Sequence, residues 1–85
     1  MARTLDLVAL RSFVAVVDSG GVTRAAGLLN LTQSAVSMQL KRLEESLNLG
    51  LFARAARKLT LTPEGEQLIG FARKMLSLNH EALAR

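Results

Sequence analysis

The sequence predicts a small, mainly α-helical domain that ends in one long helix. Three observations favour this fold class. Hydrophobic residues make up 49% of the 85 residues, yet only three are Phe and none is Trp or Tyr, so the core must be aliphatic. Good helix formers dominate the composition, and apolar residues recur at intervals of three and four. A chain of this length supports one small core.

A first helix is predicted from about Asp6 to Ser19. Asp6 is a suitable N-cap, and Gly20-Gly21 ends the helix because glycine readily adopts the left-handed conformation. The apolar residues expected on its buried face are Leu7, Leu10, Phe13, Val14 and Val17.

A second helix, from about Val22 to Leu29, is followed closely by a third. The turn Asn30-Leu31-Thr32 separates them, and the Thr32 hydroxyl is expected to cap the third helix. Two small residues, Ala25 and Ala26, let another helix approach the second one closely. Two helices joined by so short a turn form a helix-turn-helix if they cross at a steep angle.

The third helix, from Thr32 to about Leu47, has two different sides, and Asn48-Leu49-Gly50 ends it. One side is a narrow apolar stripe made of Val36, Leu40, Leu43 and Leu47. The other faces carry Gln33, Ser34, Ser37, Met38 and Lys41. Small, uncharged hydrogen-bonding groups at the start of a helix suit a reader of the DNA major groove. The alternative is that they cap and solvate an ordinary surface helix.

A β-hairpin is predicted after the third helix. Leu51-Phe52 is expected to fill part of the core, and Leu59-Thr60-Leu61 alternates as a half-buried strand does. Arg54 to Lys58 lies between these two pieces. The cations of this stretch are therefore expected at the tip of the hairpin.

The last helix begins at Thr62-Pro63-Glu64, which combines a capping hydroxyl, a first-turn proline and an acid at the positive end of the helix dipole. It is expected to continue to Arg85, and the lack of a terminating Gly or Pro suggests a longer protein. So small a domain leaves little core for its apolar stripe, so pairing with a second copy is expected, with Asn79 helping to fix the register. The stripe consists of Leu68, Ala72, Met75, Asn79 and Ala82.

Charge is distributed unevenly along the chain, whose net charge is +4 at pH 7. The ranges Ser19–Leu43 and Ser46–Pro63 each contain three cations and no acid, and the cations are Arg24, Lys41, Arg42, Arg54, Arg57 and Lys58. This segregation favours a polyanionic partner for the middle of the chain. An ordinary solvated surface is the alternative.

The sequence argues against catalysis and against a metal or other cofactor. Cys is absent, and His80, the only histidine, has no second ligand nearby. Glu44 and Glu45 point about 100° apart on a helix, which suits ion pairs with Lys41 or Arg42 better than acid–base chemistry. The first residues lack the pattern of a secretory signal, and no apolar run spans a bilayer, so a cytoplasmic location is expected.

The chain resembles the DNA-binding domain of the LysR-type transcriptional regulators. The matching residues follow one another in the family's order and spacing: Leu10-Arg11-Ser12-Phe13-Val14-Ala15-Val16, Thr23-Arg24-Ala25-Ala26, Thr32-Gln33-Ser34-Ala35-Val36-Ser37, Leu43-Glu44, Leu51-Phe52-Ala53-Arg54 and Leu61-Thr62-Pro63-Glu64-Gly65. The resemblance implies a winged helix-turn-helix in residues 1–62, with a three-helix core and a short hairpin wing. It implies a linker and dimerisation helix in residues 63–85, and an effector domain that this chain lacks.

The resemblance also implies which residues meet DNA. Base edges would be read by Gln33, Ser34, Ser37 and Met38. The DNA backbone and minor groove would be contacted by Thr23, Arg24, Thr32 and Lys41, and by Arg54, Arg57 and Lys58 of the wing. Met38 replaces the long polar or basic residue that many members carry, which favours contact with a thymine methyl group.

These expectations combine into one function, sequence-specific binding of double-stranded DNA by a homodimeric transcriptional regulator at an interrupted palindrome. Two other classes remain open. A protein-interaction module would use the same aliphatic helices, with its basic surface incidental. A winged-helix repressor that responds to an anion or a metal is also conceivable, although the lack of Cys and the single His argue against metal sensing.

Overall fold

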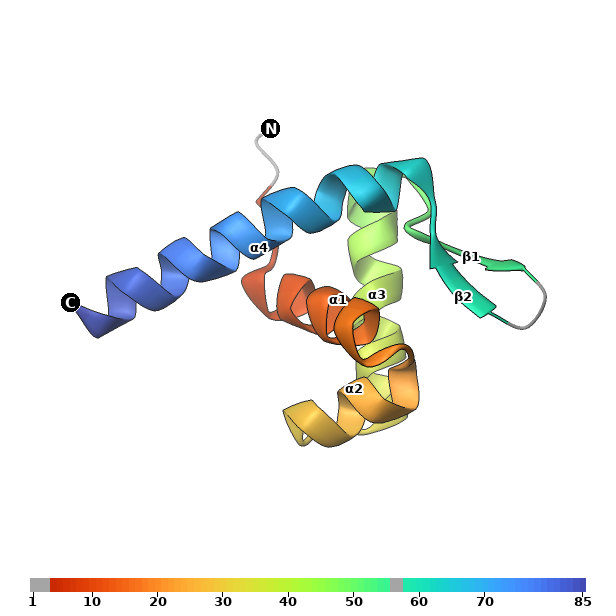
Figure 1. The fold of residues 1–85 in the computed structure, drawn as a ribbon, viewed down its shortest axis with the longest axis horizontal. Coiled ribbons are helices and arrows are strands. Elements are labelled where there is room, and N and C mark those ends of the chain that lie inside the picture. The colour runs from red at the N-terminus through yellow and green to blue at the C-terminus, as the bar shows by residue number, and fades with distance from the viewer. Residues whose placement is uncertain (1–3, 56–57) are drawn as a thin grey trace.

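The computed structural model describes residues 4–55 and 58–85. Within them it contains four helices and one hairpin (Figure 1). Their bounds are α1 (Leu7–Ser19), α2 (Val22–Leu29), α3 (Gln33–Leu47), β1 (Phe52–Ala55), β2 (Lys58–Leu61) and α4 (Pro63–Ala84). The order and approximate bounds agree with the elements expected from the sequence. Figure 1 shows α4 extending past the other helices toward the C-terminus, while the hairpin projects from the other end of the molecule.

Side chains near the helix starts satisfy backbone groups that the helices leave free. The Asp6 carboxylate accepts a hydrogen bond from the Val8 N–H at 2.8 Å, and the Thr32 hydroxyl accepts one from the Ala35 N–H at 3.0 Å. Gly20 ends α1 in the left-handed conformation with φ 90°. Because these contacts depend on short-range chemistry, the sequence predicted each of these boundaries.

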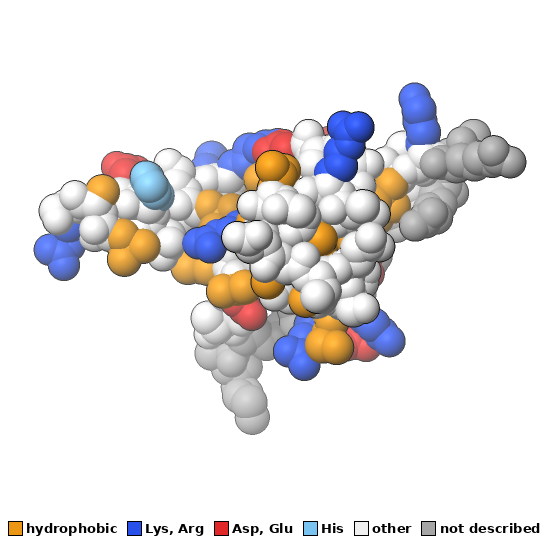
Figure 2. Space-filling model, turned by 90° about the horizontal axis from the view of Figure 1, so that it is seen from below, with side chains coloured by type: hydrophobic (Ala, Val, Ile, Leu, Met, Phe, Trp, Pro, Cys, Tyr) orange, Lys and Arg blue, Asp and Glu red, His pale blue; other side chains and the backbone are white. Residues whose placement is uncertain are grey.

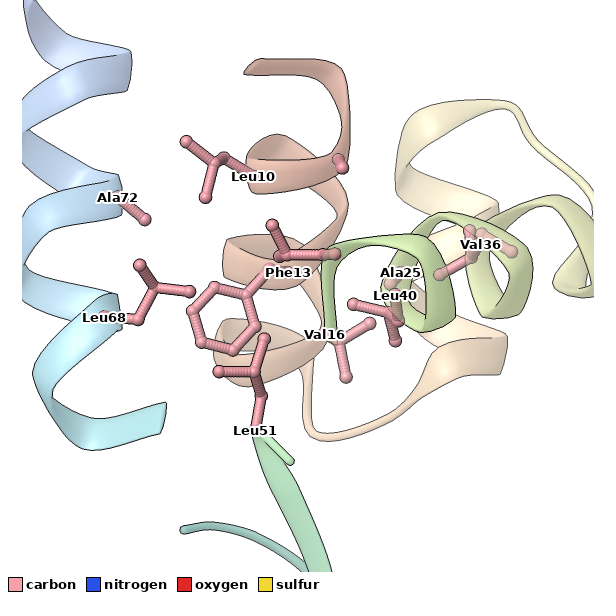
Figure 3. Close-up of a cluster of buried hydrophobic side chains, with 12 residues drawn as sticks. Leu10, Phe13, Val16, Ala25, Val36, Leu40, Leu51, Leu68 and Ala72 are labelled. Carbon is pink, nitrogen blue, oxygen red and sulfur yellow. The ribbon is translucent and has the colours of Figure 1, made fainter. Parts of the chain in front are cut away.

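One core joins all four helices, because α1 packs against α2, α3 and α4. Figure 3 shows Leu10 and Phe13 of α1 between the helices, with Leu51 from the segment before β1 below them. The Phe13 ring also meets the edge of Phe52, with ring centroids 5.5 Å apart and an interplanar angle of 68°. The residues fully buried at the centre include Leu10, Phe13, Val16, Val36 and Leu51.

The buried face of α1 differs from the expected one. Leu7 is 37% exposed, while Ala9, Ser12 and Val16 are buried instead. Val14 and Val17 are only partly buried. The buried face is therefore turned about the helix axis toward Ala9, Ser12 and Val16, because α1 packs against α2, α3 and α4 at once.

The short α2 packs closely on α1 and α3. Ala25 and Ala26 are its two buried residues, as their small size predicted. Asn30 ends α2 and Asn48 ends α3, both in the left-handed conformation, with φ 58° and 55°. The helix-turn-helix therefore has the short connection that the sequence indicated.

The hairpin is antiparallel, and its strands are longer than the sequence suggested. Phe52 pairs with Leu61, and Arg54 pairs with Leu59. Arg54 therefore lies within β1 and Lys58 at the start of β2, so both belong to strands, whereas the sequence placed them between the strands. The predicted tip residue Arg57 lies outside the described residues.

The first half of α4 belongs to the common core, which corrects part of the predicted dimer seam. Leu68 and Ala72 are buried against α1 within the same chain, and Ala72 has 0% exposure (Figure 3). The expectation that so small a domain leaves little core for the stripe was wrong for these two residues, because α4 packs against α1. Met75 and Asn79 are half-buried and Ala82 is exposed.

None of the helices in residues 4–55 and 58–85 is long and apolar enough to span a bilayer.

Candidate nucleic-acid interface

The polar side of α3 is open to solvent. Gln33, Ser34, Ser37, Met38 and Lys41 are all exposed, and at 100° per residue they cover an arc of roughly 140°. Val36, Leu40 and Leu43 hold the other side of the helix in the core. The residues predicted to read bases thus share one accessible surface.

A part-buried hydrogen bond joins α3 to α1. The Ser12 hydroxyl, which is completely buried, donates to the Gln39 side-chain oxygen. A directional contact of this kind limits how far α3 can rotate about its axis, and thus which side chains face outward. Sequence reasoning missed this pair. Its only signal was a serine placed among the apolar residues of the first helix.

The starts of α2 and α3 keep their positive electrostatic potential. Neither helix has an acidic residue in its first turn, and α2 also lacks a side-chain cap. By contrast, α4 has Glu64 and Glu66 in its first turn. Uncompensated helix N-termini attract phosphate groups. Thr23 and Arg24, both exposed, lie in the first turn of α2.

Several cations are available around this surface. Arg24, Lys41 and Lys58 are exposed, and none of them forms an ion pair with a carboxylate of residues 4–55 or 58–85. Figure 2 looks at the molecule from below the view of Figure 1. The body of this face is largely uncharged there, and Lys and Arg side chains lie around its edges together with some Asp and Glu side chains. The side chain of Arg54 and the whole of Arg57 lie outside what the structure describes.

Two polar side chains attach the hairpin to the helices. The Glu44 carboxylate accepts a hydrogen bond from the Leu51 N–H at 2.7 Å. The Thr62 hydroxyl donates to the Gly50 carbonyl at 2.7 Å and accepts from the Gly65 N–H at 3.0 Å. The expected ion pair of Glu44 with Lys41 or Arg42 is therefore absent among the described residues, because the carboxylate faces the entry to the hairpin. Nothing in the residue pattern indicated this role for Glu44.

The described residues offer no cluster of three His, Cys, Asp or Glu side chains with which to hold a metal ion. The candidate interface offers exposed hydroxyl, amide and cationic groups on two helices and a hairpin.

Comparison with known proteins identifies the family. The sequence model described as "Bacterial regulatory helix-turn-helix protein, lysR family" matches residues 7–66. Among curated relatives, the HTH-type transcriptional regulator PecT of Dickeya dadantii is 50% identical over 80 residues, which are 94% of this chain and 25% of PecT. The HTH-type transcriptional regulator DgdR of Burkholderia cepacia is 40% identical over 84 residues, 99% of this chain and 29% of DgdR. The chain thus spans about a quarter of these relatives.

Solved structures agree with this assignment. The crystal structure of the BenM DNA-binding domain with catB site 1 DNA has a TM-score of 0.88 and 38% identity, and covers 94% of this chain and 90% of that one. The CbnR DNA-binding domain complex with DNA has a TM-score of 0.81 and 30% identity, with 95% and 100% covered. A C206 mutant of Corynebacterium glutamicum OxyR has a TM-score of 0.90 and 32% identity, with 98% and 26% covered. The chain belongs to the LysR family of bacterial transcriptional regulators, and it is a winged helix-turn-helix DNA-binding domain of that family rather than an enzyme.

Proposed function

We propose that this domain binds double-stranded DNA with α3 in the major groove and the hairpin over the adjoining minor groove, as part of a longer dimeric regulator in the bacterial cytoplasm. The observation that carries the proposal is the exposed polar start of α3, where Gln33, Ser34 and Ser37 are accessible while Val36 and Leu40 hold the helix in the core. Side chains at this end of a recognition helix reach base edges in helix-turn-helix proteins.

The chemistry of each exposed residue suggests its contact. The Gln33 amide presents a donor and an acceptor, which match the N6 and N7 groups of adenine. Ser34 and Ser37 pair with several bases through their hydroxyls. Met38 is 54% exposed and uncharged, which suits the methyl group of thymine.

Phosphate contacts supply most of the affinity in this proposal. Thr23 and Arg24 lie at the acid-free start of α2, and Thr32 at that of α3. Lys41 is exposed two turns along α3. Lys58 lies in the hairpin, and Arg54 and Arg57 would add to it. Such contacts fix the register of the protein on the duplex but do not specify its sequence.

The exposed side of α4 from Phe71 onward is the proposed dimer contact, with a second copy of this chain as the partner. Phe71 is 60% exposed and Leu78 is 65% exposed. With Met75 and Ala82 they form a stripe at steps of four, three and four, which is the spacing of a helix–helix seam. Asn79 lies beside this stripe, whereas Leu68 and Ala72 face the chain's own core. Two subunits joined in this way would read the two halves of an interrupted palindrome.

Selection of duplexes from a random pool tests the proposal. The expected result is an enriched sequence with two inverted half-sites, which binds the chain more tightly than a shuffled duplex of the same composition in a fluorescence titration. Equal affinity for both duplexes at moderate salt would reduce the activity to nonspecific attraction. No measurable binding to either duplex would contradict the proposal and favour a protein-interaction module.

A further inference from the structure

The direction in which α4 leaves the domain depends on contacts in its first half. Gly65, Leu68 and Ala72 are buried, and Met75 packs at the edge of the core. Beyond Met75, Leu78 and Leu83 are exposed, and Figure 1 shows this part of α4 extending away from α1. A small change of tilt at the core therefore moves the whole exposed half.

Within the described part of the chain, one ion pair joins α1 to α4. The Arg73 guanidinium donates two hydrogen bonds to the Asp18 carboxylate, at 2.7 and 3.1 Å. Asp18 lies in the last turn of α1, and Arg73 lies midway along α4. Apolar packing of two helices leaves their crossing angle a range of about 15–20°. Two parallel N–H···O bonds between planar groups are directional, so this pair narrows the range of crossing angles open to α1 and α4.

The Ser12–Gln39 hydrogen bond also joins α1 to α3, the proposed recognition helix. Asp18 therefore moves together with α1 and α3, and Arg73 links α4 to them. From Arg73 to Ala84 the helix rises about 16 Å at ~1.5 Å per residue. A tilt of about 10° would displace its end by about 3 Å, close to the ~3.4 Å rise of one base pair.

We infer that the Asp18–Arg73 pair sets the angle between α4 and the recognition helix, and thereby the spacing between half-sites that the dimer accepts. This inference rests on the proposed function, since it requires a dimer that reads two half-sites. Asp18 and Arg73 are then positioning residues, which determine operator specificity without contacting DNA.

The test measures affinity as a function of spacer length. The ligands are the duplex selected from the random pool, the same duplex with its spacer changed by one or two base pairs in either direction, and a duplex with one half-site. The proteins are the 85-residue wild-type chain and the variants Arg73→Gln, Asp18→Asn and the charge exchange Asp18→Arg/Arg73→Asp. Lys74→Gln is the matched control, because it removes an exposed cation from the next position of α4.

The wild-type chain is expected to prefer the selected spacer. Arg73→Gln and Asp18→Asn should each reduce that preference by at least about threefold, a modest coupling for residues in one network. Affinity for the single half-site should stay within about twofold of wild type, because no DNA contact is lost. The charge exchange should restore the preference, and Lys74→Gln should leave it unchanged. Thermal unfolding and sedimentation of each variant establish that it is folded and dimeric.

Three results would overturn the inference. Arg73→Gln and Lys74→Gln could give the same spacer profile, the charge exchange could fold and dimerise without restoring the preference, or the wild-type chain could bind all spacers equally. Each of these outcomes leaves DNA binding itself intact. Failure of the pool to yield any bound duplex would instead refute the proposed function.

Discussion

Gly65 lies so close to the Leu51 carbonyl oxygen that a β-carbon at residue 65 would overlap it. The Leu61 side chain would also stand only 2.9 Å from that carbon. The first turn of α4 therefore packs directly on the segment that leads into β1. Only glycine permits this approach, which places the hairpin and the last helix in a fixed relation.

Replacing Gly65 with Ala is expected to destabilise the domain. The clash involves a backbone oxygen, which cannot rotate away, so α4 must shift. Overpacking of this kind costs about 1–3 kcal/mol, and here it outweighs the helix propensity gained. Urea unfolding measures the change in the free energy of unfolding.

Gly70→Ala is the matched control, because Gly70 lies on the same helix and nothing stands within 4 Å of the added carbon. It should stabilise the domain by about 0.5–1 kcal/mol. Equal effects of the two substitutions would mean that the close approach of Gly65 to Leu51 has no energetic importance.

A second prediction concerns the hydrogen bond from the Leu51 N–H to Glu44. Glu44→Ala leaves a part-buried N–H without its charged acceptor, and should lower the free energy of unfolding by about 1.5–3 kcal/mol. Glu44→Gln keeps an acceptor oxygen at the same distance from the backbone and should lower the free energy of unfolding by less. Glu45→Ala, at an exposed neighbouring position, should change stability by under ~0.5 kcal/mol. If Glu44→Ala matched Glu45→Ala, the carboxylate would not hold the hairpin.

The elements could be predicted from the sequence because they depend on neighbours in the chain. Thr32, Thr62 and Gly20 act over three or four residues, and the spacing of Val36, Leu40 and Leu43 reports a single helix face. The exposed polar side of α3 follows from the same periodicity. These parts of the fold and of the candidate site are local consequences of residue order.

The remaining features depend on contacts between distant segments. Leu68 and Ala72 have the spacing of a dimer seam, but whether α1 or a second copy covers them depends on tertiary packing. Likewise, the neighbouring cations in the sequence predict an ion pair for Glu44. Only the folded chain brings the Leu51 N–H, at the entry to the hairpin, within hydrogen-bond distance of its carboxylate. Periodicity identifies an apolar face but does not say which partner covers it.

A third prediction concerns the part-buried Ser12–Gln39 hydrogen bond. Ser12→Ala and Gln39→Ala should each destabilise the domain, because each removes a partner from a part-buried polar contact. In a double-mutant cycle their coupling should be about 1 kcal/mol. Ser77→Ala, at an exposed position of α4, serves as the control and should be near neutral. Additive effects of the two core substitutions would show that the hydrogen bond does not restrain α3.

A fourth prediction follows from the charge state of Asp18. Hydrogen bonding from Arg73 lowers the pKa of the Asp18 carboxyl below its ordinary value, against a smaller opposing effect of burial. The same contact raises the pKa of Arg73, which stays protonated throughout. A carboxyl whose pKa is lower in the folded state stabilises the fold above its unfolded pKa of about 3.9, and loses this effect as the pH falls through the folded value.

The stabilisation is expected to be below about 1 kcal/mol, since both side chains are about half exposed and screened by solvent. Urea midpoints of wild type and Asp18→Asn should differ slightly at about pH 6 and converge once the pH has fallen below the lowered pKa of Asp18. Raising the salt concentration at about pH 6 should reduce the difference between the two urea midpoints. A difference that persisted in acid would have to come from something other than the ionised pair.

The last prediction separates base reading from phosphate binding on the proposed DNA surface. Gln33→Ala should weaken binding to the selected duplex by about 1–3 kcal/mol and relax the preference at one base pair, since an amide pairs with one base edge. Affinity for shuffled DNA should change little. Gln67→Ala, which removes an exposed amide from α4, should change the affinity for neither the selected nor the shuffled duplex.

Arg24→Gln should instead weaken binding to every duplex alike. It should also reduce the slope of log K against log salt by about 0.9 for a single lost phosphate contact. Fluorescence titrations at four salt concentrations measure both quantities. The two classes of residue are distinguished by how the affinity depends on sequence and on salt. Counterion release does not depend on the DNA sequence, whereas an amide–adenine pair depends little on the salt concentration. A Gln33 variant that lost affinity equally on all duplexes would place this side chain on the DNA backbone, and an unchanged slope for Arg24→Gln would remove the start of α2 from the interface.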